Sequence, residues 1–343
     1  MNRPVFFHET DLFRPHNDPD DHYDLACLFA LAGMGLAELG GILLDYPPSP
    51  AFGDPDIAAP AALSEITGIP VPVGVGQRGP GLAPGSGLSL LKQTLEKASS
   101  PVTVFIVGSC RDVCEAGKRW PSLFREKVGA IYLNAGAGCD TPKLEYNVWL
   151  DPRSFAGIFS LPCPVYWMPC FHSMESENTV GRHGTWWHFR QKRIFDLLSP
   201  AVLNYFLDAL SRRQGADWLS SLSAPVDPRL RDFFGESFRN MWCTAGFLHA
   251  AGLSVTREGA IVPLGKEPRK EVFSFRPVSV SCPEDGHALW REAAEGETDR
   301  YLFTVEDPAS YEEAMTSALA SLLSRLSEKG SLSPPETSFR SYP

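Results

Sequence analysis

Short apolar runs and helical apolar stripes alternate along the first half of the chain. The apolar run at residues 5–7 is followed by apolar side chains at positions 23, 26, 27, 30, 31 and 34, a spacing that places them on one face of a helix. Residues 102–107 form an uninterrupted β-branched and aromatic run, typical of a central strand in a parallel sheet. Further strands are expected at residues 39–46, 69–75, 130–133 and 164–168, and helices at 57–67, 88–98 and 153–159. This alternation predicts an α/β fold with a mainly parallel, doubly wound (Rossmann-like) sheet flanked by helices.

The second half of the chain has a different pattern. Residues 184 to about 213 and 233–251 are expected to be helical, and residues 253–264 a hairpin around Glu258-Gly259. Residues 273–280 alternate as a half-buried strand does, 301–305 is a further strand, and 310–326 is an amphipathic helix. We expect one domain over residues 1–343, with a core at 4–170, a helical part of the site and cap at 171–252, a helical and small β elaboration at 253–330, and a loose tail at 331–343.

Composition narrows the classes of function. The chain has 343 residues and a net charge of −10 without a basic run, which argues against nucleic-acid binding. No apolar run approaches the roughly 20 residues that span a bilayer, and the N-terminus lacks the apolar core of a signal peptide. The eight cysteines lie mostly in apolar segments without a CxxC motif. We therefore expect reduced cysteines in a cytoplasmic protein that does not bind a membrane.

Polar residues gather where the expected strands end. Asp11, Asp20 and Asp21 follow the first strand, Asp45 follows the second, and polar segments follow the later ones at 107–112, 134–138 and 145–147. In a parallel sheet these ends meet at one edge, where α/β proteins bind ligands. Carboxylate, amide and carbonyl oxygens are ligands of hard cations, so the pattern indicates a site for Ca²⁺, or for Mg²⁺. Taken alone, Asp20 and Asp21 are equally well explained as acidic residues at the start of a helix.

Four segments, in the same order, resemble the inosine–uridine-preferring nucleoside hydrolase family. Thr10-Asp11, with Asp20-Asp21 before an apolar helix, is similar to the Asp at the end of that family's first strand and the Asp-Asp pair that opens its first helix. Residues 104–109 resemble its strand ending in Gly-Pro-Leu-Thr-Asn, and residues 134–137 resemble its Met-Gly-Gly loop. Residues 145–152 resemble its Glu-Phe-Asn…Asp-Pro segment, which is the most specific match. The resemblance covers about residues 4–170 and is weak beyond them.

The resemblance implies a Ca²⁺-dependent hydrolase of N-glycosidic bonds in a nucleoside or a related ribosyl compound. Asp11 would be the general base that activates water and a metal ligand, and Asp21 the main metal ligand. The other roles implied are a backbone carbonyl ligand from Val107 and substrate contacts from Asp20, Asp45, Asn134, Glu145 and Asn147. The resemblance also implies a homodimer or homotetramer that acts on a small-molecule substrate.

The chain departs from the family pattern in three places. Eight residues, Leu12–Pro19, separate Asp11 from the Asp-Asp pair where the family usually has three, which brings His16, Asn17 and Asp18 into this segment. Asp45 is the residue nearest to the position where the family has an Asn. The family's later helix starts His-Asp-x-x-Ala, and our register places Arg239 and Asn240 there, with Asn240 as a metal ligand. Because Arg239 cannot be a general acid near neutral pH, a second reading is a fold relative that binds a sugar or nucleoside without hydrolysing it, and a third is a hydrolase of another glycoside.

Three further groups of residues allow both a functional and a structural interpretation. His172, His183 and His188, with Glu175 and Glu177, could supply an acid or a second metal site, although their spacings match no zinc pattern and surface histidines explain them too. The aromatic side chains of Trp186, Trp187 and Phe189, expected on a helix, could stack on a base or belong to the core. Cys110 lies in a turn that resembles a nucleophile turn, but it follows an apolar strand without a matched His, which favours a buried thiol.

Overall fold

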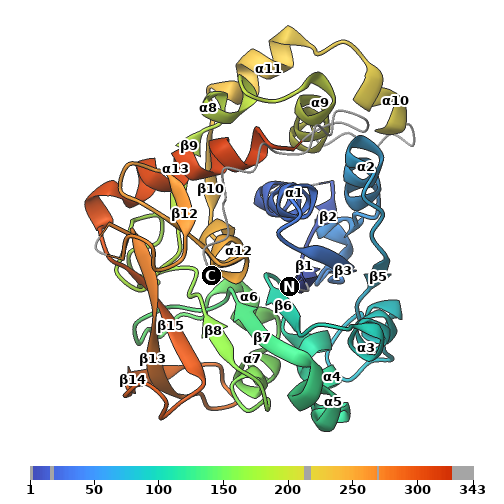
Figure 1. The fold of residues 1–343 in the computed structure, drawn as a ribbon. Coiled ribbons are helices and arrows are strands. Elements are labelled where there is room, and N and C mark those ends of the chain that lie inside the picture. The colour runs from blue at the N-terminus through green and yellow to red at the C-terminus, as the bar shows by residue number, and fades with distance from the viewer. Residues whose placement is uncertain (1–2, 16–18, 212–217, 269, 327–343) are drawn as a thin grey trace.

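A nine-stranded sheet forms the centre of the protein (Figure 1). The computed structural model describes residues 3–15, 19–211, 218–268 and 270–326. Six parallel strands are β1 (Val5–Thr10), β3 (Glu38–Leu44), β5 (Val73–Val75), β6 (Val102–Ile106), β7 (Val128–Leu133) and β8 (Val165–Trp167). They lie side by side in the order β5-β3-β1-β6-β7-β8. This is the doubly wound order, so the α/β fold class predicted from the sequence is confirmed, and the order reverses between β1 and β6.

The C-terminal strands extend this same sheet. Strand β15 (Arg300–Val305) pairs in parallel with β8, and β13 (Phe273–Ser281) pairs antiparallel with β15. Both confirm strands expected from the sequence. Strand β14 (Leu289–Glu292) at the edge was not expected, because its residues are mostly exposed and carry no apolar alternation. The hairpin β11 (Leu253–Val255) and β12 (Ile261–Pro263) is confirmed, with Gly259 supplying a positive φ of 80° in its turn.

Helices cover both faces of the sheet (Figure 1). One face packs against α1 (Asp20–Gly33), α2 (Ala58–Thr67), α9 (Pro200–Leu210), α12 (Thr244–Ala250) and α13 (Pro308–Leu323). The other packs against α3 (Ser86–Lys97), α4 (Arg111–Arg119), α5 (Pro121–Lys127) and α7 (Pro152–Ile158). Because strand side chains alternate, Phe6 belongs to the first core and Phe7 to the second.

The segment from residue 184 to 251 differs from the expected pair of helical stretches. Trp187–Arg190 is a strand, β9, which pairs antiparallel with β10 (Phe238–Met241). The shorter helices α8 (Lys192–Phe195), α10 (Trp218–Ser223) and α11 (Pro228–Gly235) join α9 and α12 in this part of the chain. The helical expectation for 186–190 was wrong because Trp187 and Phe189 point inward while His188 and Arg190 point outward, a period of two rather than 3.6.

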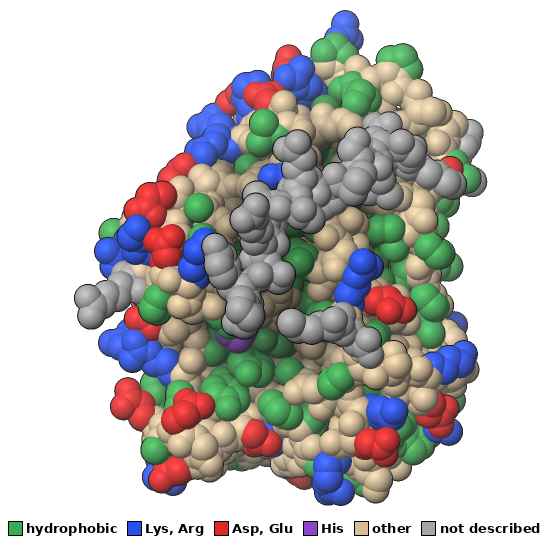
Figure 2. Space-filling view, in the orientation of Figure 1, with side chains coloured by type: hydrophobic (Ala, Val, Ile, Leu, Met, Phe, Trp, Pro, Cys, Tyr) green, Lys and Arg blue, Asp and Glu red, His purple; other side chains and the backbone are tan. Residues whose placement is uncertain are grey.

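The remaining elements are short and close to the ends of the parallel strands. Strand β2 (Phe13–Arg14) pairs with β4 (Asp54–Pro55), a 3₁₀ turn covers Pro50–Phe52, and α6 spans Tyr146–Leu150. The predicted tail at 331–343 lies outside the described residues. Within the described part of the chain, no helix is long and apolar enough to cross a membrane. Figure 2 shows acidic and basic side chains interspersed along the left edge of one face, so neither sign of charge dominates there.

Candidate functional site

A cavity of about 770 Å³ opens at the carboxyl ends of β1, β6 and β7. This is the edge of the sheet at which the strand order reverses, the place where doubly wound proteins bind ligands. Its polar lining comes from Asp11, Asp20, Asp21, Asp24, Val107, Asn134, Lys143, Glu145, Asn147 and Glu177. The structure therefore brings Asp11, Asp20, Asp21, Val107, Asn134, Glu145 and Asn147 together, as the sequence predicted.

Two carboxyl groups, those of Asp11 and Asp21, lie within hydrogen-bonding reach of each other. Asp11 follows β1, Asp21 lies in the first turn of α1, and Thr10 Oγ1 donates a hydrogen bond to Asp21 Oδ1. Burial raises the pKa of Asp11, and the charge of Asp20 raises it further. Burial and the charge of Asp11 likewise raise the pKa of Asp21. Such a pair is held either by a shared proton or by a cation.

The donor atoms on this side of the cavity suit a hard cation. They are the oxygens of Asp11 and Asp21, with the Val107 carbonyl on the same wall, and Ca²⁺ and Mg²⁺ prefer such ligands. Among the described residues, no three His, Cys, Asp or Glu side chains are already gathered as a complete ligand set. The chemistry of the donors therefore fits a cation, which would offset the repulsion between these carboxyl groups when they are ionised.

The floor of the cavity is a buried polar network that joins β7 to α12. Asn134 donates to the Met168 carbonyl at 2.8 Å and to Thr185 Oγ1 at 3.0 Å. Its Oδ1 accepts from the Cys243 thiol at 3.3 Å and from the Cys170 thiol at 3.5 Å. Burial raises the pKa of both thiols well above the ordinary value, so they are neutral donors. Asn134 has little capacity left for a substrate contact.

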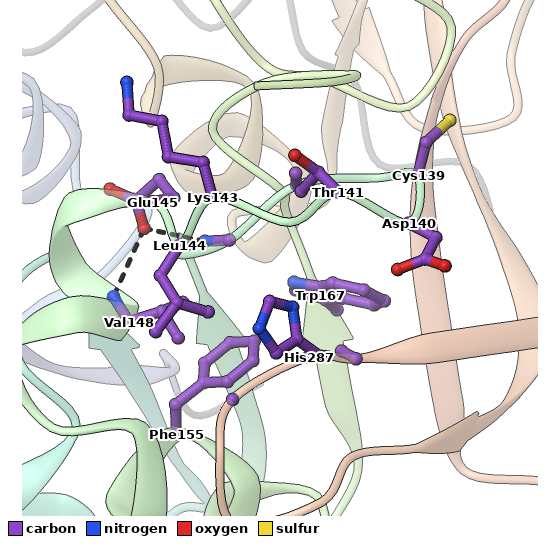
Figure 3. A pocket seen from close by; sticks show the side chains of 14 residues that line it. Cys139, Asp140, Thr141, Lys143, Leu144, Glu145, Val148, Phe155, Trp167 and His287 are labelled. Atoms are coloured by element: carbon purple, nitrogen blue, oxygen red, sulfur yellow. Dashed lines mark hydrogen bonds between the residues drawn. The ribbon is translucent and has the colours of Figure 1, made fainter. Parts of the chain in front are cut away.

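Glu145 and Asn147 lie on the wall formed by α6, and both contact backbone groups. The Glu145 carboxylate accepts from the Gly136 amide at 2.8 Å and the Asn147 amide at 2.9 Å, so it caps α6. Figure 3 shows its further bond from the Val148 amide at the start of this helix. Asn147 Nδ2 donates to the Asn134 carbonyl at 3.2 Å and is 3.4 Å from the Val107 carbonyl. Both side chains therefore fix the loops around the cavity in addition to lining it.

A much smaller cavity of about 20 Å³ lies behind this wall (Figure 3). Glu145, Leu144 and Lys143 border both cavities, and His287, Phe155 and Trp167 close the small one on the other side. Its volume is about that of one water molecule, so it has no room for a substrate.

Two predicted site residues are not on the cavity wall. Asp45 is fully buried and bound on both oxygens, to the Ser109 amide at 2.8 Å and to Arg111 Nη2 at 3.1 Å. Asn240 lies on β10, paired with His188 of β9. The residues that β10 and α12 present to the cavity are Trp242 and Cys243, because the helix begins at Thr244 rather than near Asn240.

An aromatic wall faces the carboxylates, and sequence reasoning did not identify it. It consists of Phe13, Phe52, Tyr146, Trp149, Phe171 and Trp242. Phe171 and Trp242 pack edge to face with centroids 6.0 Å apart, and Trp149 is 59% exposed at the mouth. All six rings lie in loops or in elements of two to five residues, where no periodicity marks them. Such rings can pack against a planar ring of a ligand.

Of the other candidate residues, Glu177 lines the cavity, and the following side chains are buried or contact other protein groups. Trp186, Trp187 and Phe189 are buried and do not line the cavity, and the Cys110 thiol is fully buried. His188 Nδ1 is 2.6 Å from Glu312 Oε2, and His183 Nδ1 is 3.3 Å from the Phe303 carbonyl. The Cys139 thiol lies 3.5 Å from His172. The predicted contributions of His16, Asn17 and Asp18 fall outside the described residues.

Comparisons with known proteins show which solved structures have a similar fold. No protein-family model matches the sequence, and no curated protein matches it at a significant level. Among solved structures, a plant nucleoside hydrolase is 14% identical with a TM-score of 0.58, covering 95% of this chain and 99% of its own. The purine-preferring ribonucleoside hydrolase of Gardnerella vaginalis is 13% identical with a TM-score of 0.56, over 93% and 99%. A protein described as an effector is 13% identical with a TM-score of 0.51, over 94% and 95%. With the sheet order above, these similarities show that the chain has the nucleoside hydrolase fold.

Proposed function

We propose that this protein hydrolyses the N-glycosidic bond of a nucleoside or a related ribosyl compound. The observation that carries the proposal is the pair of buried carboxyl groups, Asp11 and Asp21, which opens into a large cavity at the reversal point of the sheet. The fold supports it, since two of the similar structures are named as nucleoside hydrolases.

In this proposal, some residues of the cavity bind the sugar, and others bind the leaving group. Asp11 accepts the proton of the attacking water, which general-base catalysis makes worth about 10²–10⁴-fold in rate. Asp20, Glu145 and Asn147 contact the sugar hydroxyls, and the aromatic wall contacts the departing ring. A Ca²⁺ ion held by Asp11, Asp21 and the Val107 carbonyl would orient the vicinal hydroxyls and lower the pKa of water.

The test is calorimetric titration of metal-free protein with Ca²⁺, together with a reducing-sugar assay on inosine, uridine and p-nitrophenyl riboside. We expect wild-type protein to bind Ca²⁺ and release ribose, and Asp21→Ala to lose both. Asp285→Ala, an exposed carboxylate in the turn between β13 and β14, is the matched control and should retain both. Unchanged binding and activity in Asp21→Ala would contradict the site.

A second candidate function is binding of a sugar or nucleoside without hydrolysis. It is favoured by Trp242 and Cys243 at the start of α12, neither of which is an acid near neutral pH. Ca²⁺ and nucleoside binding without ribose release from any of the three compounds would support it. The assembly as a homodimer or homotetramer and the cytoplasmic location stay predictions, the first to be checked by light scattering.

A further inference from the structure

A fourth aspartate, Asp24, lines the cavity, and the family resemblance gives it no role. It is one helical turn after Asp20 and Asp21 on α1, and it lines the same cavity. Asp24 is 1% exposed. Within the described part of the chain, no hydrogen-bond donor reaches its Oδ1 atom. A buried carboxyl with an unsatisfied oxygen is costly, so this position needs an explanation.

One neighbour of Asp24 is Cys243, the residue just before α12, which carries no carboxylate. The two side chains lie within hydrogen-bonding reach of each other, and Cys243 also lines the cavity. The single proton of the Cys243 thiol is directed to Asn134 Oδ1, and the thiol is neutral, so it is a poor ligand for a hard cation. Asp24 therefore supplies a carboxyl group beside Asp21 at the place where α1 meets Cys243.

We propose that Asp24 is a ligand of the cation held by Asp11 and Asp21, so that α1 supplies the carboxylate missing from α12. This inference rests on the proposed function, because it uses the same cation. A third carboxylate adds an oxygen ligand and further attraction for a divalent ion, and the number of charged ligands is a main determinant of Ca²⁺ affinity. Besides burial, the charges of Asp11 and Asp24 both raise the pKa of Asp21, and a bound cation would offset this repulsion.

The experiment transfers the carboxylate from one helix to the other. Ca²⁺ affinity is measured by calorimetry, with Tb³⁺ luminescence as a second readout, for wild type, Asp24→Asn, Cys243→Ser and the double variant Asp24→Asn with Cys243→Asp. We expect Asp24→Asn to weaken Ca²⁺ binding at least about tenfold, because one charged ligand is lost. Cys243→Ser should bind as wild type does, and the double variant should regain most of the lost affinity. Circular dichroism and melting curves confirm that each variant is folded.

Each alternative result has a distinct meaning. Wild-type affinity in a folded Asp24→Asn variant would overturn this inference and leave the proposed function intact. Equal losses in Asp24→Asn and Cys243→Ser, with Zn²⁺ bound more tightly than Ca²⁺, would make the thiol the ligand and also overturn it. Absence of any Ca²⁺ binding by wild-type protein would contradict both this inference and the cation of the proposed function.

Discussion

The Cys243 thiol donates a hydrogen bond to Asn134 Oδ1 at 3.3 Å, which ties the start of α12 to the end of β7. Both residues are buried, and Asn134 also donates to the Met168 carbonyl and to Thr185. One amide side chain thus connects three segments under the cavity, so Asn134 determines the shape of the site more than it contacts a substrate.

Replacing Asn134 by alanine should therefore destabilise the protein. The change leaves a buried carbonyl and a buried hydroxyl with fewer donors, at a cost of about 1–3 kcal/mol for each unsatisfied group. The measurement is the free energy of unfolding in urea. Asn240→Ala, at a half-buried position on β10, is the matched control and should change stability much less. Equal effects of the two variants would contradict this assignment.

Asp45→Ala should lower stability without changing the Michaelis constant. Asp45 and Arg111 form a fully buried ion pair, and removing one partner of such a pair costs about 3–5 kcal/mol. Because Asp45 is not on the cavity wall, substrate binding measured well below the melting temperature should be unaffected. The double variant Asp45→Leu with Arg111→Met should recover most of the stability. A raised Michaelis constant with normal stability would instead make Asp45 a substrate contact.

Glu145→Ala should affect both stability and substrate binding. The side chain caps α6, which carries Tyr146 and Trp149 of the aromatic wall, and loss of a cap costs about 1–2 kcal/mol. The comparison is Asp227→Ala, which removes the cap of α11 outside the cavity. Both variants should melt at a lower temperature, and only Glu145→Ala should raise the Michaelis constant.

Trp242→Ala should weaken binding of compounds with an aromatic leaving group. Trp242 packs edge to face on Phe171 in the aromatic wall, and loss of such a ring contact is worth about 0.5–1.5 kcal/mol beyond the buried area. The ratio of affinities for p-nitrophenyl riboside and methyl riboside isolates the aromatic part. Phe233→Ala, on exposed α11, should leave the ratio unchanged. A ratio that Trp242→Ala also leaves unchanged would exclude contact with the leaving group.

His8 should make the protein less stable in acid. This β1 side chain is buried against Phe105 and Phe247, and burial lowers its pKa to about 3. The native state keeps it neutral, whereas the unfolded state binds a proton below the ordinary histidine pKa of 6.5. The contribution of neutral His8 is therefore present above pH 6.5 and falls by about 1.4 kcal/mol per pH unit as the pH drops toward 3.

The measurement is the difference in unfolding free energy between wild type and His8→Leu as a function of pH. The difference should change with pH only in that window, because the other titrating groups are common to both proteins. His287→Gln, a half-buried position far along the chain, should show the wild-type slope. Parallel curves for wild type and His8→Leu would contradict a neutral buried His8.

Local patterns were sufficient for the parallel strands of the sheet and for half of the site. Residues 102–107 and 130–133 could be assigned to β6 and β7 because apolar β-branched runs bounded by turns have few other structures. Asp11, Asp20 and Asp21 could be placed together because the end of a parallel strand and the start of the next helix are joined by a short loop.

The tertiary structure determined the other half of the candidate site, because residues that meet there, such as Asp24 and Cys243, are far apart in the sequence. Asp24 lies within an apolar helical stripe, and only the packing of α12 beside α1 places it next to Cys243. The start of α12, and hence the choice of Trp242 and Cys243 over Asn240, depends on the pairing of β9 with β10. The acidic stretch and the order of the parallel strands follow from local sequence, whereas the contact between Asp24 and Cys243 depends on the packing of α12 beside α1, which no local pattern encodes.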